Sequence, residues 1–330
     1  MTDVDGDRDA AAFEALRPRL IGVAYRMLGT MAEAEDVVGD VAERWMRSDR
    51  EAVRVPEAWL MSVTSRRALD VLKSARMRRE RYPGVWLPEP VATDDAPDVI
   101  ADRDDTLTMG FLLLLERLTP LERAVFVLHD VMGHPHDEIA AMLDRSVVAS
   151  RQALRRARLH VQVPRARREE DRAAARRVAE RFLVAGAGGN LEEFLACLAP
   201  DVTVVSDGGG VVYASIRPVV GRQRAGRYLT NLSRRSGELF VVPMELNRSP
   251  GFVLCGDLGW IALLFDVDGD QITTIRAVVH PAKLERLVAR LPGTDHLPSP
   301  WDRASRYRHR GGRPTGVDSV SHAAIDQTGP

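Results

Sequence analysis

The segment HDEIAAMLDRSVVASRQALRRARLH, residues 136–160, decides the fold of the first half of the chain. It contains two short helical patterns separated by Asp144-Arg145-Ser146. The second pattern repeats small or apolar residues along one helix face: Ser150, Ala153, Leu154 and Ala157. Two such helices predict a helix-turn-helix, whose second helix enters the major groove of DNA. The alternative is an ordinary amphipathic hairpin, because Ser150 is an unusual seam residue and the turn lacks glycine.

The opposite side of the second helix carries side chains suited to reading bases. Packing on the small face leaves outward Val147, Val148, Arg151, Gln152 and Arg155. Arginine pairs bidentately with guanine and glutamine with adenine, and each good pair contributes roughly 1–3 kcal/mol of discrimination. We expect Arg156 and Arg158 to bind phosphate, which positions a protein on DNA without specifying the sequence.

Charge is distributed unevenly along the 330 residues, although the formal net charge is only -1. Residues 66–81 hold seven basic side chains against two acids, and residues 150–181 hold eleven arginines against four acids. Residues 94–105 are the reverse, with six aspartates against one arginine. Two separate basic blocks predict two contacts with a polyanion. The plain alternative is two solvated helix faces.

The first half of the chain is expected to be helical over residues 11–81 and again over 105–163. Thr30, after a glycine break, is a candidate helix cap, and Pro56 suits the first turn of a third helix. Between the two blocks, residues 82–105 contain four prolines and therefore predict an extended linker.

The pattern changes in the second half of the chain. Strand-like runs are rich in β-branched residues and are bounded by Gly, Asp or Pro: 202–205, 211–216, 239–246, 252–254, 260–267 and 272–279. Helical patterns cover 190–198, 223–234 and 281–291. Helices with a curved antiparallel sheet predict an α+β domain. Residues 292–330 are rich in Pro, Gly, Ser and Arg and predict a disordered tail.

Composition disfavours several other classes of protein. Cys197 and Cys255 lie in apolar segments and are interpreted as buried thiols of a reducing compartment. The N-terminal ten residues are acidic and lack the apolar core of a signal peptide, and the run 251–267 is too short to span a bilayer. We therefore expect a cytoplasmic protein without membrane contact. The absence of a Cys/His cluster predicts no metal or other cofactor.

The run LERLTPLERAVFVLHDVMGHPHDEIAAMLDRSVVASRQALRRAR (115–158) resembles region 4 of extracytoplasmic-function (ECF) sigma factors, which binds the promoter −35 element in that family. AEDVVGDVAERW (34–45) resembles the polymerase-binding helix of region 2, and PEAWLMSVTSRRALDVLKSARMRRE (56–80) resembles the helices that open and read the −10 element. The resemblance covers about half the chain. It implies an alternative sigma factor that binds core RNA polymerase, at the β′ clamp and β flap, and acts on double-stranded and melted promoter DNA.

The resemblance also implies roles for individual residues. The polymerase-facing set is Glu35, Asp36, Val38 and Asp40, although Gly39 stands where the family usually has Gln. The −10 set is Arg66, Arg67, Asp70, Lys73 and Arg76. The −35 set is Val147, Val148, Arg151, Gln152, Arg155 and Arg156. Trp59 suits either base stacking or packing in the core.

The linker motif YPGVWLPEP (82–90) resembles that of ECF sigma factors with a C-terminal SnoaL-like domain, and residues 179–210 resemble the opening of that cone-shaped fold. DGGG (207–210) and HPAKL (280–284) resemble two short motifs of the same subgroup. The implied regulatory contact comprises Trp86, Leu87, Pro88, Glu89, Pro90, Asp207, Gly208, Gly209, Gly210, His280, Pro281, Lys283 and Leu284. The implied bounds are 8–81 for region 2, 82–105 for the linker, 106–163 for region 4 and 172–291 for the SnoaL-like domain.

On this reading the chain is mainly α in its first half and α+β in its second, which packs against regions 2 and 4, sets their spacing and docks the linker motif. The SnoaL-like pocket leaves room for a small ligand. One rival is an enzyme tethered to DNA, with Asp201, Asp207 and His280 as acid–base candidates. A second rival is a one-component regulator that binds an operator without polymerase.

Overall fold

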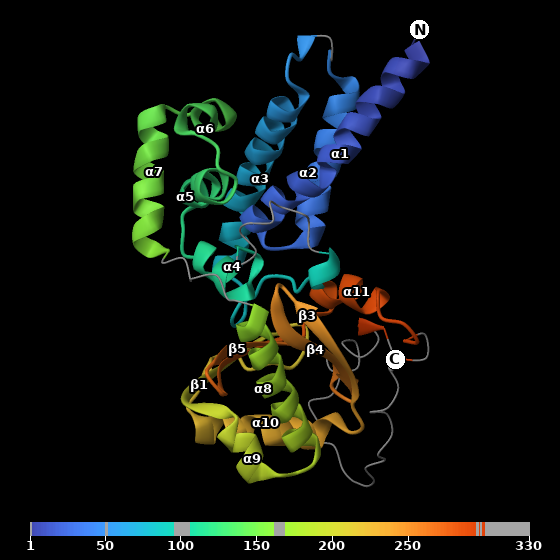
Figure 1. The fold of residues 1–330 in the computed structure, drawn as a ribbon, viewed down its shortest axis with the longest axis vertical. Coiled ribbons are helices and arrows are strands. Elements are labelled where there is room, and N and C mark those ends of the chain that lie inside the picture. The colour runs from blue at the N-terminus through green and yellow to red at the C-terminus, as the bar shows by residue number, and fades with distance from the viewer. Residues whose placement is uncertain are drawn as a thin grey trace. The chain divides into compact units, whose positions relative to one another are not determined.

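The computed structural model describes residues 2–49, 52–95, 106–161, 169–294, 297 and 299–300. The chain divides into two compact units (Figure 1). The first unit comprises Met1–Arg172 together with the short turn Glu245–Ser249. The second unit comprises Ala173–Met244 and Pro250–Pro330.

Three helices open the first unit: α1 (Thr2–Leu28), α2 (Met31–Arg47) and α3 (Pro56–Glu80). Gly29 ends α1 with a φ of 78°, a left-handed conformation that glycine adopts without strain. Thr30 occupies the N-cap position of α2 as expected, but its side chain donates to Glu33 instead of capping the helix. Pro56 starts α3 as expected, where its missing N–H has no cost.

A second helical block follows the linker: α4 (Met109–Leu115), α5 (Pro120–Phe126), the π-helical turn η4 (Val127–Val131), α6 (His136–Leu143) and α7 (Val147–His160). Thr119 and Glu122 form a capping box at the start of α5, and Ser146 accepts a hydrogen bond from Ala149 N at the start of α7. Asp144 takes the left-handed conformation between α6 and α7, with a φ of 53°. An aspartate therefore fills the place where glycine is usual in this turn.

Both helical blocks contribute to one hydrophobic core. Buried side chains from Phe13 to Leu72 and from Leu107 to Val161 form a single contiguous cluster. Helix α3 packs on α5 and α6, and α5 packs on α7. The two helical blocks that carry the segments expected to bind DNA are therefore packed together in one core.

The second unit contains a six-stranded sheet in the order β2-β1-β6-β5-β4-β3. The strands are β1 (Leu198–Asp207), β2 (Val219–Val220), β3 (Phe240–Leu246), β4 (Ser249–Gly256), β5 (Gly259–Asp268) and β6 (Gln271–Val278). The helices are α8 (Glu169–Ala187), α9 (Leu191–Ala196), α10 (Arg222–Ser236) and α11 (Pro281–Ala289). Side chains of α8, α9 and α10 join those of β1, β4, β5 and β6 in a common core.

Aromatic rings fill much of that core. The Phe182 ring stacks on Phe194 with centroids 4.6 Å apart and meets Phe265 edge-on at 5.7 Å. Phe252 meets Phe265 edge-on at 5.9 Å. A surface depression of about 430 Å³ lies elsewhere in the unit, beside Val220 and the start of α10.

The α+β class is confirmed, but two sequence predictions were wrong in detail. The sheet is mixed, because β1 pairs with β6 in parallel. Residues 211–216 form no strand, although they include β-branched side chains. Gly209 and Gly210 both have positive φ, so the chain turns away from the sheet at the end of β1.

Several predictions fall on residues outside the described ranges. They include most of the acidic run 94–105, residues 162–168 of the basic block 150–181, and most of the tail after residue 294. Among the described residues, no helix is both long enough and apolar enough to cross a membrane.

Candidate nucleic-acid interface

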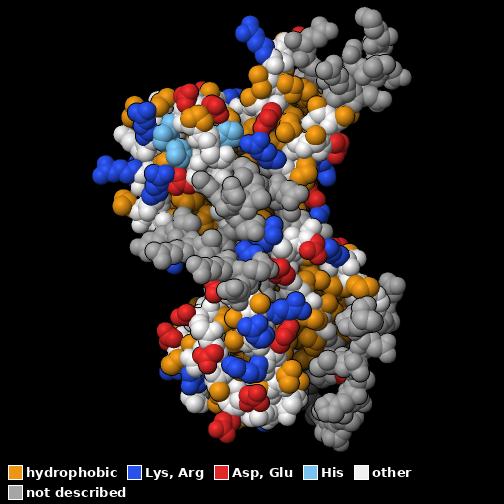
Figure 2. Space-filling view, viewed as in Figure 1, with side chains coloured by type: hydrophobic (Ala, Val, Ile, Leu, Met, Phe, Trp, Pro, Cys, Tyr) orange, Lys and Arg blue, Asp and Glu red, His pale blue; other side chains and the backbone are white. Residues whose placement is uncertain are grey.

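Helix α7 presents the side chains expected to read bases. Val148 is 61% exposed, and Arg151, Gln152 and Arg155 are also exposed, whereas Val147 is half-buried. Figure 2 shows basic side chains projecting over this helix. The opposite face is buried and includes Ser150, whose Oγ lies 2.9 Å from His136 Nδ1 at the start of α6. The polar seam residue thus has a polar partner, which ties the two helices together.

The remaining arginines of α7 are paired within the same helical block. Arg156 Nε donates to Glu122 at 2.7 Å, and Arg158 donates twice to Asp130, at 2.5 and 2.9 Å. Burial of Glu122 opposes ionisation, but the bonds from Arg156 and Thr119 outweigh it and hold the pKa of that carboxyl below its usual value. Arg156 therefore anchors α7 on α5 while its exposed side stays open to solvent.

A group of histidines lies next to the recognition helix, visible in pale blue in Figure 2. The rings of His129 and His136 are 4.5 Å apart, and His129 Nδ1 lies 2.8 Å from Asp130. Burial, the neighbouring His129, and the cations Arg151 and Arg158 lower the pKa of His136, although Asp130 opposes the shift. The lowered pKa favours the neutral form of His136, the residue that contacts Ser150 across the two helices.

Two residues of the −10 set contact backbone carbonyls of the second helical block. Arg66 donates to Met142 O at 2.5 Å and to Ala141 O at 2.8 Å, and Arg76 donates to Leu118 O at 3.2 Å. The first two carbonyls lie in the last turn of α6, where acceptors lack intrahelical partners and carry the negative end of the helix dipole. Both guanidinium groups thus bind partial negative charge here.

The other members of the −10 set contact residues of α2 and α3, the helices that resemble region 2. Arg67 Nε donates to Asp40 at 2.8 Å, and Lys73 donates to Asp70 at 2.9 Å on the exposed side of α3. Asp40 was expected to face polymerase, so one residue of that set is already paired with one of the −10 set. Exposed pairs of this kind contribute about 0.2–1 kcal/mol and separate readily.

The polymerase-facing set needs one correction. Asp36 and Asp40 are exposed and Glu35 is half-buried, but Val38 is only 1% exposed and lies in the core of the first unit. Val38 follows Val37 on the inward side of α2, so the helical period turns both valines away from solvent. Trp59 is half-buried and packs against the core, with its ring 5.3 Å from that of Trp45.

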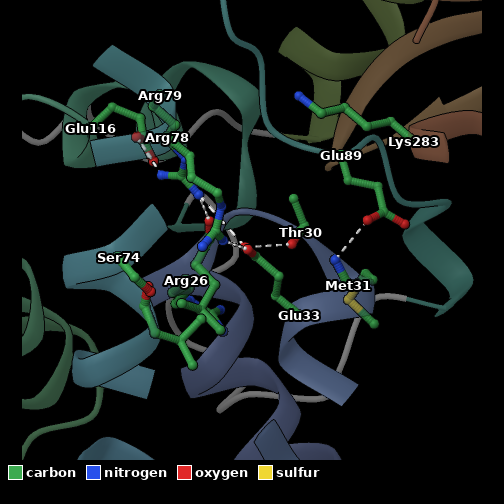
Figure 3. Close-up of polar contacts among 12 residues, drawn as sticks. Arg26, Thr30, Met31, Glu33, Ser74, Arg78, Arg79, Glu89, Glu116 and Lys283 are labelled. Carbon is green, nitrogen blue, oxygen red and sulfur yellow. Dashed lines mark hydrogen bonds and ion pairs between the residues drawn. The ribbon is translucent and has the colours of Figure 1, made fainter. Parts of the chain in front are cut away.

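A charged node that the sequence did not reveal joins α3 to α5. The carboxylate of Glu116 accepts from Arg79 Nη1 at 2.6 Å (Figure 3) and also from the buried Arg123. Arg123 Nε also donates to Arg26 O at 2.9 Å. Burial raises the pKa of Glu116, but Arg123 and Arg79 outweigh this and hold that pKa below its usual value. The charged residues come from separate segments of the chain, so their contact cannot be predicted from local sequence spacing.

The linker motif folds onto the junction of α1 and α2. Trp86 lies so close to Gly29 that a Cβ there would stand 2.7 Å from the ring, and the Arg79 guanidinium lies 3.7 Å from the Trp86 ring centroid. Glu89 Oε2 accepts from Met31 N at 2.8 Å (Figure 3), and Glu89 N donates to Gly29 O at 2.8 Å. Glu89 therefore caps α2 in the place that Thr30 leaves unfilled. The prolines Pro88 and Pro90 flank it, and both are buried.

The two short motifs of the second unit meet each other. Lys283 Nζ donates to Asp207 Oδ2 at 2.7 Å, and both side chains are buried. Val279 N donates to Asp207 O at 2.9 Å, which fixes the start of α11 beside the end of β1. Burial and then Lys283 lower the pKa of the half-buried His280. Pro281 begins α11, and Leu284 is buried behind it.

Two acid–base candidates of the enzyme alternative, Asp207 and His280, lie in the two motifs that meet, whereas Asp201 lies six positions before Asp207 on β1. Asp201 is exposed on β1, whereas Asp207 is buried in its pair with Lys283. Gly208 is packed so tightly that a Cβ would lie 2.7 Å from Ala214 and from Val212 O. No group of three or more metal-ligating side chains occurs within the described ranges.

Comparisons with known proteins match both helical blocks of the first unit and, for two relatives, most of the chain. The family Sigma-70 region 2 matches residues 12–78, and the family Sigma-70, region 4 matches residues 109–161. The ECF RNA polymerase sigma factor SigJ of Mycobacterium tuberculosis is 40% identical over 235 residues, which cover 69% of this chain and 74% of SigJ. The probable ECF RNA polymerase sigma factor SigI of the same organism is 34% identical over 295 residues, covering 87% of this chain and 98% of SigI. The crystal structure of SigJ matches with a TM-score of 0.67 and 32% identity, over 83% of this chain and 98% of that one.

Proposed function

The chain belongs to the ECF sigma factors of RNA polymerase, and from that premise we propose how its own residues divide promoter recognition. A sigma factor binds core polymerase and directs transcription initiation at particular promoters. The α7 helix reads the −35 element, α3 engages the −10 element, and the exposed acids of α2 face the polymerase. The observation that carries this division is the outward position of Arg151 and Gln152 on α7, opposite a seam that α6 holds in place.

At the −35 element, Val148, Arg151 and Gln152 contact base edges, and Arg155 and Arg156 contact the backbone. Removing Arg151 costs about 1–3 kcal/mol of discrimination at one base pair. The test is transcription with core polymerase from promoters varied at each −35 position, using Arg151→Ala. Relaxed preference at one position supports the assignment, whereas uniform weakening at all positions assigns Arg151 to phosphate.

At the −10 element, Arg66 and Arg76 bind carbonyls of the second helical block in the packed first unit. These bonds occupy donors that would otherwise be available to phosphate, so the packed arrangement weakens promoter binding by these two side chains. We infer that polymerase, by holding regions 2 and 4 apart, frees Arg66 and Arg76. This predicts weak promoter binding by the chain alone and tight binding with core enzyme.

The polymerase contact involves Glu35, Asp36 and Asp40 on α2, with the β′ clamp as partner, while region 4 meets the β flap. Val38 supports this surface from the core. Asp40 leaves Arg67 when it binds polymerase, so a single event prepares two sites. Asp36→Arg should weaken core binding, measured by polarization of a labelled chain, while Arg47→Glu on the same helix serves as a charge-reversal control.

The second unit regulates initiation and carries out no turnover of its own. The buried Asp207–Lys283 pair supports a structural role for the two short motifs. Asp207→Asn with full-length chain should alter promoter-dependent transcription without abolishing core binding. Conversion of small ketones by the wild-type chain, lost on replacing Asp201 or His280, would instead establish the enzyme alternative.

A further inference from the structure

We propose that the turn Glu245–Ser249 is a latch that holds regions 2 and 4 of the first unit together. This latch turn joins β3 to β4, yet it groups with the first unit. The proposal rests on the proposed function, because it concerns the closed arrangement that must open when polymerase separates the two regions.

The backbone of the latch turn is specialised. Asn247 and Arg248 have φ values of 50° and 58°, so two consecutive residues are left-handed. Two such residues between paired strands form a tight two-residue hairpin turn, where asparagine is favoured because it tolerates this conformation. The conformation of the turn therefore restricts where the Asn247 side chain can lie.

The Asn247 side chain and backbone make four hydrogen bonds to three segments. Asn247 N donates to Val91 O at 2.8 Å, and Val91 N donates to Asn247 Oδ1 at 3.0 Å. Asn247 Nδ2 donates to Tyr25 Oη at 2.8 Å and to Leu107 O at 3.2 Å. Asn247 is 1% exposed, so the amide is fully enclosed and both of its donors are used.

These three segments are the ones that must move apart on opening. Tyr25 lies on α1 of region 2, Val91 follows the linker motif, and Leu107 leads into α4 of region 4. Tyr25 Oη also donates to Glu89 O at 2.8 Å, which extends the node to the residue that caps α2. Any displacement of Leu107 from Tyr25 therefore breaks bonds made by one amide.

Further contacts hold the linker against the latch turn. Leu246 and Ala92 form a β-bridge, and Arg248 N donates to Thr93 Oγ1 at 3.0 Å. Buried groups that lose partners are penalised by their desolvation. Separation of regions 2 and 4 is thus disfavoured as long as the latch turn stays in place. Because the latch turn connects β3 to β4, a movement of these strands would also move the latch turn.

The first test measures opening in the full-length free chain. Spin labels at Met46→Cys and Leu159→Cys, which are 51% and 75% exposed, report the distance between α2 and α7 by double electron–electron resonance. Asn247→Asp keeps a residue compatible with the turn but replaces both donors by an acceptor. Asn247→Gly keeps the turn and removes the side chain. Both variants should move the distance distribution to longer values.

The second test measures the apparent Kd for core polymerase. A chain that is mostly closed binds with a Kd raised by the inverse of its open fraction. Asn247→Asp should therefore bind core polymerase about tenfold more tightly than wild type, and Tyr25→Phe should shift the Kd in the same direction. The double variant should gain less than the two single changes combined, because both remove the same bond.

The matched control is Asn190→Asp, which makes the same chemical change at the exposed N-cap of α9 in the second unit. It should leave both the distances and the Kd at wild-type values. Unchanged distances in both Asn247 variants would overturn the latch. If core binding also became weaker while the distances stayed the same, the turn would have only a structural role. Failure of the wild-type chain to bind core polymerase would instead refute the proposed function and leave the distance test standing.

Discussion

Replacing Glu116 by Gln should destabilise the first unit by about 2–3 kcal/mol at neutral pH. The Glu116 carboxylate balances Arg79 and the buried Arg123. Breaking one side of a buried ion pair costs about 3–5 kcal/mol, because the remaining charge is left unpaired. The Glu116 side chain is 21% exposed, so water offsets part of this penalty. We therefore expect a loss of about 2–3 kcal/mol, below the range for a fully buried pair.

The matched control is Glu43→Gln, which removes an exposed pair with Arg47 one helical turn away. That change should cost no more than about 0.5 kcal/mol. The Glu116 effect should also depend on pH. Because the folded-state pKa is depressed, the carboxyl contributes stability above its unfolded pKa of about 4.3 and loses it as the pH falls through the folded value.

Pulsed hydrogen exchange with mass spectrometry, carried out during a urea titration, measures the unfolding free energy of the first unit by itself. Peptides of α3 and α5 report on that unit. We expect the difference between wild type and Glu116→Gln to be complete at pH 7 and to shrink below about pH 4. Equal effects of Glu116→Gln and Glu43→Gln, or a Glu116 effect that does not change with pH, would refute the role assigned to this node.

Three further predictions use the same exchange method. Glu89→Gln should destabilise α2 by about 1 kcal/mol, because the side chain that caps Met31 N loses its charge. Destabilisation that is confined to other helices would contradict this prediction. Gly29→Ala should cost more than about 1 kcal/mol, since the left-handed φ and the Trp86 ring both oppose a Cβ, and a neutral result would count against the linker packing. The pKa of His136 is lowered on folding, so the stability of α6 and α7 should fall as the pH drops below about 6.5, and His136→Gln should flatten that dependence.

The helix-turn-helix was predictable because its periodicity is local. The turn at residues 144–146 and the outward arginines of α7 followed from the spacing of the small residues on one face. The serine in the seam could not be explained in this way, since its partner His136 lies fourteen positions earlier, at the start of the preceding helix. Val38 was misplaced because a role carried over from the family overrode the helical period, which points that residue inward.

Features made by distant segments were not predictable from spacing. Glu116 meets Arg79 from 37 positions away, and Asn247 meets Tyr25 from 222 positions away. The parallel pairing of β1 with β6 is also a non-local choice that strand composition does not encode. Residues 211–216 had strand-like side chains, but the glycines before them determine the path of the chain.

Run-off transcription with purified core RNA polymerase tests the central claim most directly. The template is a library of genomic fragments, and the full-length chain is added or withheld. The account predicts transcripts that depend on the chain, share two spaced promoter elements, and lose one base preference in Arg151→Ala. Core polymerase that gives the same transcripts with and without the chain would contradict it.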